Sequence, residues 1–192
     1  HFYQVDCGKL SGLSMLGYGS LSGSYAGVWD TRGPSFHIDS KVERLNIHQG
    51  NVKDMKVAMT YETGKLDVMA TVENEQMQGG VLLAYDLSDS LNFLSTRGQL
   101  RIDELAAFGL DIKGGQEALE TSFEIIHAGQ ENKSFTNLSL TDFKYTCDTA
   151  TFTIDKISME DNQKGDHNTT TLKSDVVDLF ISGNFRELRP VP

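Results

Sequence analysis

The chain has 192 residues and a mass of 21.2 kDa, enough for a sizeable core in one large domain or two small ones. It carries 17 Lys and Arg against 27 Asp and Glu, a formal net charge of −10, which argues against a nucleic-acid-binding protein with a basic surface. Hydrophobic residues make up 39%, as in a folded domain, and no apolar stretch approaches the roughly 20 residues of a transmembrane helix.

The first seven residues have neither a charged segment nor an apolar one, so we expect no signal peptide here. Either a cytosolic protein or an excised or mature part of an exported one fits this start. The two cysteines, Cys7 and Cys147, are too few for a disulfide framework. A single bridge, two buried thiols and two free thiols all remain open.

The first half of the chain predicts strands. Segment 11–33 is rich in Gly and Ser but keeps large apolar residues, which is typical of glycine-punctuated strands rather than of a linker. Apolar residues at 36, 38 and 42 predict one strand, and those at 45 and 47 predict another. Residues 55–61 and 66–72 alternate between apolar and polar on either side of Gly64, which predicts a hairpin.

Further alternating runs cover 81–87, 100–102, 121–125, 138–140, 143–145, 152–154, 157–159 and 177–185. A slip of one residue between Ile154 and Ile157 predicts a bulge. The polar segment 160–168 predicts a hairpin turn rather than a calcium loop, because it lacks a terminal bidentate Glu. Spacings of about 8–14 residues predict an all-β protein, since βαβ units need long helical segments between strands.

Helical signal is confined to 103–108, where we expect one or two turns capped near Asp103 and stopped at Gly109. No change of composition divides the chain, so we predict a single β-rich domain over 1–192. Zinc, phosphate-loop, dinucleotide and nucleophile-elbow motifs are missing from the sequence. We therefore expect no catalytic residues, no metal and no cofactor, and a protein that is not an enzyme.

A protein with many strands and almost no helix has large apolar sheet faces and few helices to bury them. Two architectures answer this need. One is a curled antiparallel β-sheet groove with one short helix, whose concave face stays apolar and open to lipid. The other is a closed β-sandwich whose same residues form a dry core.

Three stretches carry a resemblance to a known family. Segment 157–185 contains a polar turn, then Leu-Lys-Ser-Asp at 172–175, then Ile-Ser-Gly-Asn-Phe at 181–185. Segment 98–110 runs from a strand into Leu-Ala-Ala-Phe-Gly-Leu, and 10–27 is a glycine-punctuated ladder. In these features the chain resembles the TamB/AsmA-like proteins of the Gram-negative cell envelope, over roughly half its length.

The resemblance implies a β-taco architecture and an internal fragment of a longer periplasmic protein anchored to the inner membrane. It also implies phospholipid or another hydrophobic ligand, inner-to-outer-membrane phospholipid transport or outer-membrane protein assembly, and a barrel partner for the full-length chain. The residues expected to line the groove belong to one parity of the alternating runs: Val57, Met59, Leu66, Val68, Leu83, Leu100, Ile102, Phe123, Ile125, Leu140, Phe152, Ile154, Leu179 and Ile181.

An alternative function is a surface-exposed β-sandwich module for adhesion or carbohydrate binding. Tyr18, Tyr25 and Trp29 lie in the glycine-rich segment and are suited to stack on sugar rings. A trough is elongated and takes up a hydrophobic dye, whereas a sandwich is compact and dry inside.

Overall fold

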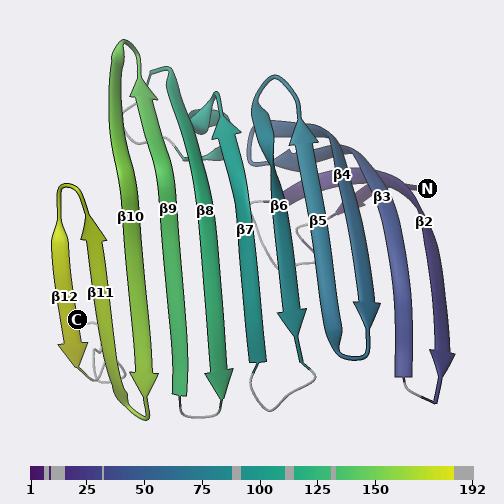
Figure 1. Ribbon diagram of the computed structural model, residues 1–192. Coiled ribbons are helices and arrows are strands. Elements are labelled where there is room, and N and C mark those ends of the chain that lie inside the picture. Colours follow the sequence, from purple (N-terminus) through teal and green to yellow (C-terminus); the bar gives the residue numbers. More distant parts are fainter. Residues whose placement is uncertain are drawn as a thin grey trace, which may run out of the picture.

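The computed structural model describes residues 1–6, 9, 16–31, 33–87, 92–110, 115–130 and 133–183. Twelve strands form one antiparallel sheet in chain order, with β1 and β12 at its edges (Figure 1). The strands are β1 Phe2–Asp6, β2 Leu16–Asp30, β3 Gly33–Ile47, β4 Gly50–Glu62, β5 Lys65–Glu73, β6 Met77–Asp86, β7 Asn92–Ile102, β8 Glu117–Gln130, β9 Lys133–Cys147, β10 Ala150–Lys164, β11 His167–Ser174 and β12 Asp178–Gly183.

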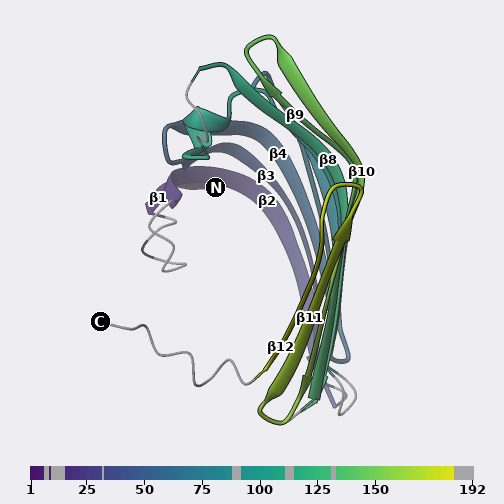
Figure 2. The same ribbon diagram turned by 90° about the vertical axis from the view of Figure 1, so that its left-hand side faces the viewer.

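The sheet is curled, and the short 3-10 helix η1, Leu105–Phe108, lies on its concave side near one end (Figure 2). This arrangement confirms the predicted all-β fold with a curled sheet and one short helix. The closed β-sandwich is wrong, because a sandwich needs two sheets packed face to face and the described residues form only one.

The predicted hairpin is β4 and β5. Its turn has only two residues, Thr63 and Gly64, with φ angles of 51° and 81°. Two positive φ angles belong to the type I′ turn, whose twist matches that of the flanking strands. The predicted polar segment also forms a hairpin, with Gly165 at φ 62°, but its turn is shorter than expected: 160–164 belong to β10 and 167–168 to β11.

The two strands expected over 36–47 are instead one strand, β3. Within β3 the apolar residues change from even to odd positions, because the ladder with β4 is distorted between Val42 and Leu45. On either side of the distortion apolar residues are paired, Val42 with Met55 and Leu45 with Val52. Asp54 lies at this level with φ 57°, the left-handed conformation, and ion-pairs with Lys41. Alternation broken by such a distortion is easily read as the end of a strand.

A second distortion is present where the slip before Ile157 predicts a bulge. Asp142 of β9 has φ 54°, and the β8–β9 register shifts between Glu120 and Ser122. Segments 138–140 and 143–145 are thus parts of one strand. Ile154 of β10 pairs with Phe143, and Ile157 pairs with Leu140. Even-numbered residues of β10 before the bulge and odd-numbered residues after it therefore point to the same face of the sheet.

The buried core lies beneath η1. Val52, Ile102, Leu105 and Phe108 are each almost fully buried. The side chains packed against them come from β3 to β9 and mark the concave face of the sheet: Leu45, Ile47, Met55, Val72, Met77, Leu100, Leu119 and Tyr145. η1 thus covers one end of that face.

η1 ends as predicted, because Gly109 adopts the left-handed conformation with φ 73° at its C-cap. Its start differs from the prediction. The N-cap is Glu104, without a side-chain hydrogen bond. Asp103 instead accepts a 2.8 Å hydrogen bond from Nε of Arg101, so its carboxylate is engaged on the strand side. Within the described ranges no helix has the length and apolarity needed to cross a membrane.

Candidate functional site

A row of side chains crosses the concave face from β2 to β12, one from each strand. Each member is the ladder partner of the next, and together we call them the central row: Tyr25, Ile38, Met59, Val68, Leu83, Thr96, Ile125, Leu138, Met159, Leu172 and Leu179. Met59 shares the parity of Met55, which packs against the η1 core, and this places the row on the concave face. Thr96 is the one member of the row that is neither aliphatic nor aromatic.

The central row is long and open. Adjacent strands lie about 4.8 Å apart, so ten spacings give an arc of about 48 Å. Most members are half-buried by their neighbours, and Leu179 at the β12 edge is 49% exposed. Among the described residues no second layer lies over these half-buried apolar side chains, since η1 covers only one end of this face, so they still have surface to bury.

A second row runs between the central row and η1. Its members are Val57, Ala70, Val81, Gly98, Phe123, Leu140, Ile157 and Ser174. The Phe123 ring lies over Gly98, because a Cβ at position 98 would come within 2.9 Å of Phe123 Cζ. The missing side chain thus leaves room for the aromatic ring against the Gly98 backbone.

A third row, on the other side of the central row, changes character along the sheet. At β3 and β4 it is aromatic, with the rings of Phe36 and Tyr61 stacked 5.2 Å apart. At β8 and β9 it is polar: Nδ1 of His127 and Oγ1 of Thr136 are hydrogen-bonded at 2.8 Å. The groove therefore has an aromatic side and, about four strands further along, a polar rim.

All fourteen side chains predicted to line the groove have the concave-facing parity, as the ladder partners show. Two of them are not open to a ligand, because Ile102 is 3% exposed beneath η1 and Ile154 is 8% exposed. Phe152, Leu179 and Ile181 are exposed, and the other nine are half-buried.

The same face holds apolar side chains outside that prediction: Tyr25, Ile38, Tyr61, Val81, Tyr85, Leu94, Leu138, Met159 and Leu172. Their signal was present in the sequence, since Leu138 and Met159 stand two residues from Leu140 and Ile157 in alternating runs. Extending each run at period two would have found them.

The three aromatic residues considered for sugar stacking do not form one platform. Tyr25 and Trp29 share a face of β2 and are 70% and 82% exposed. Tyr18 has the opposite facing, because it stands at an even position of β2 next to Gly19, which pairs with the concave-facing Leu45. At most two of the three rings can contact one ligand.

Polar chemistry is concentrated beside η1, at the start of β8. Glu117 is 2% exposed, and the Tyr145 hydroxyl donates a 2.8 Å hydrogen bond to its Oε1. The Cys147 sulfur lies 4.0 Å from the same oxygen. Desolvation, followed by the hydrogen bond to Glu117, raises the pKa of Tyr145 above its ordinary value.

Across the described ranges no three His, Cys, Asp or Glu side chains are grouped to hold a metal ion. Cys147 is a free thiol, and Cys7 lies outside the described residues, as do Phe185 and part of segment 10–27.

Comparisons with known proteins add no relative: no protein-family model, no curated protein and no solved structure matches the chain.

Proposed function

We propose that this chain is a segment of a TamB/AsmA-like protein that shields lipid acyl chains on its concave face. The observation that carries the proposal is the central row, which is apolar in ten of its eleven positions and continues through every strand from β2 to β12. The resemblance of segments 10–27, 98–110 and 157–185 to that family supports it independently of the geometry.

The physical basis is transfer of alkyl surface from water. Each buried methylene contributes about 0.8 kcal/mol, so even a partly covered acyl chain gains several kcal/mol. Most successive positions in the central row offer similar apolar contacts, for example Val68 beside Leu83 and Leu138 beside Met159. A lipid can then move between strands with little change in binding energy.

The proposed setting is the periplasm, within a longer protein anchored to the inner membrane. The proposed role there is phospholipid transport towards the outer membrane, or assembly of outer-membrane proteins with a barrel partner. The net charge of −10 suits such a role, because it keeps a protein with an apolar trough soluble and weakens adsorption to anionic headgroups.

The experiment is native mass spectrometry of the chain after expression in bacteria, without a delipidation step, together with uptake of a hydrophobic dye. We expect co-purifying phospholipid and dye binding in the wild type. A lipid-free mass combined with no dye uptake would overturn the proposal.

Neighbouring residues on β5 supply matched variants. Val68 belongs to the central row, whereas Met69 points to the opposite, convex face. Val68→Asp should remove the co-purifying phospholipid and lower dye uptake, and Met69→Asp should retain the phospholipid. Val68→Thr keeps the β-branched shape and strand preference if the aspartate variant does not fold, and it should weaken dye uptake in the same direction.

Carbohydrate binding is a second candidate. It is favoured by Tyr25 and Trp29, two exposed rings on one face near the end of β2. Changing both residues to Ala and measuring retention on oligosaccharide resins tests it: loss of retention supports this function, and absence of retention in the wild type rejects it.

A further inference from the structure

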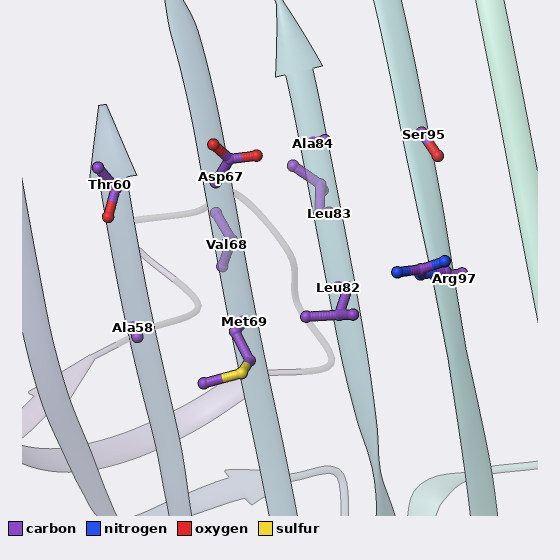
Figure 3. A pocket seen from close by; sticks show the side chains of 10 residues that line it. All are labelled: Ala58, Thr60, Asp67, Val68, Met69, Leu82, Leu83, Ala84, Ser95 and Arg97. Atoms are coloured by element: carbon purple, nitrogen blue, oxygen red, sulfur yellow. The ribbon is translucent and has the colours of Figure 1, made fainter. Parts of the chain in front are cut away.

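The convex face of the sheet carries an apolar patch on two of its middle strands. Met69 of β5 and Leu82 of β6 are directly paired there, and both are exposed. Ala58 of β4 and Arg97 of β7 continue the same row on either side (Figure 3). Figure 3 shows the Arg97 side chain reaching from its own strand towards Leu82.

Two shallow hollows flank this patch, of about 370 Å³ and 450 Å³. Met69, Leu82 and Arg97 line both of them. The first hollow, shown in Figure 3, also contains the carboxylate of Asp67. The second hollow, which we call the Gly80 hollow, has no acidic residue in its lining.

Gly80 itself has no structural need to be glycine. Its φ is not in the left-handed region, and a Cβ built there would meet only Thr71 Cγ2 at 3.5 Å and the Ala70 carbonyl oxygen at 3.6 Å, ordinary contacts. A glycine inside a strand costs stability relative to a residue with a side chain. The space left by the missing side chain is therefore room that the fold does not use.

Unused polar groups surround that space. Arg97, Gln99, Thr71 and Ser122 line the Gly80 hollow, and their side chains make no hydrogen bond or ion pair with any residue that the structure describes. Glu124 is the ladder partner of Arg97 on β8 but forms no ion pair with it in the described chain. One cation and three neutral polar groups face the hollow, beside two apolar side chains.

We propose that the Gly80 hollow binds a small amphiphile with one anionic head and a short alkyl chain. A carboxylate or phosphate head pairs with the Arg97 guanidinium, which presents donors in a fork that matches such anions. The alkyl chain lies over Gly80 against Met69 and Leu82. This site lies on the face opposite the proposed acyl groove and does not depend on it.

The test is a titration of the whole chain with octanoate, followed residue by residue in two-dimensional amide NMR. We expect the largest shifts at Gly80, Leu82, Arg97 and Gln99, with a dissociation constant in the millimolar range, as is ordinary for so few ligand atoms. 1-Octanol, which has the same chain without the charge, should bind about threefold to tenfold more weakly. Shifts confined to concave-facing residues, or equal binding of 1-octanol, would overturn the proposal.

Variants sharpen the test. In Gly80→Val the new Cβ meets only ordinary contacts and valine favours a strand, so the variant should fold, occupy the hollow and lose octanoate binding. Ser139→Val, a convex-facing position of β9 outside the hollow, is the matched control and should bind normally. Binding unchanged in Gly80→Val would reject this site.

Charge variants test the head-group contact. Arg97→Gln should weaken octanoate binding about threefold to tenfold, and Glu124→Gln should strengthen it by removing a competing carboxylate. If neither substitution changes the affinity, the anionic contact is wrong. Val68→Thr, which weakens the concave groove, should leave octanoate shifts at Gly80 unchanged, so that failure of one site is distinguishable from failure of the other.

Discussion

The Tyr145 hydroxyl donates a 2.8 Å hydrogen bond to Oε1 of Glu117 and so ties β9 to β8 beside η1. Glu117 is almost fully buried, and Tyr145 packs against the η1 core. A buried carboxylate is tolerated only with hydrogen-bond partners, because desolvation disfavours the charge. This pair therefore closes the covered end of the groove with a satisfied polar contact.

Alkaline pH should weaken the fold through Tyr145. Its pKa is raised in the folded state, so its contribution is complete below the unfolded-state pKa of about 10 and is lost as pH rises towards the folded-state value. Urea unfolding at pH about 8 to about 11 should show a steeper loss of stability in wild type than in Tyr145→Phe. Parallel pH profiles for the two proteins would contradict this assignment.

The η1 core should be the most sensitive site for packing changes. Phe108 is buried against Val52, Ile102 and Leu105, so Phe108→Ala should lower the free energy of unfolding by about 3–5 kcal/mol. Denaturant unfolding measures this loss. Ala106→Ser on the exposed side of η1 is the control, and an equal loss in both variants would show that the effect is not specific to the buried Phe108 ring.

Gly50, at the start of β4, lies against the Phe108 ring of the same core. A Cβ at this position would lie 2.7 Å from Phe108 Cε1, so Gly50→Ala must displace the ring or the backbone. We expect a loss of about 1–3 kcal/mol from overpacking, measured by thermal or urea unfolding. A variant as stable as wild type would mean that Phe108 has room to shift.

Two strand glycines should respond to alanine with opposite signs. Gly80→Ala should raise the free energy of unfolding by about 0.5–1 kcal/mol, since it removes a strand glycine and meets only ordinary contacts. Gly98→Ala should lower it, because the new Cβ would lie 2.3 Å from the Gly80 carbonyl oxygen and 2.9 Å from Phe123 Cζ. Side-by-side urea curves decide this, and equal signs would contradict the packing described.

The bulge in β9 should be specific for residues that accept a left-handed conformation. Asp142 has φ 54°, so Asp142→Val should cost about 1–2 kcal/mol, whereas Asp142→Asn and Asp142→Gly should be close to wild type. Unfolding free energies of the three variants provide the measurement. Equal stability of Val and Gly at this position would show that the bulge is not needed.

Much of this protein follows from local pattern. Alternation at period two identified β3 to β10 and β12 but neither β1 nor β11, and turn residues such as Gly64 and Gly165 identified hairpins, because side-chain facing and turn conformation are set by a few neighbouring residues. The parity of the fourteen groove residues followed from the same rule. Where left-handed residues distort the ladder, as at Asp54, alternation breaks and a long strand was divided in two.

The sequence by itself thus determined the all-β class, the helix stop at Gly109 and which side chains share a face. Only the tertiary structure decided that the sheet stays open, that η1 covers one end of its concave side, and that Ile102 and Ile154 are buried there. The Gly80 hollow also appears only in three dimensions, because it needs Met69, Leu82 and Arg97 from three adjacent strands. Curvature and coverage depend on register and on contacts between distant segments, and no local pattern encodes either one.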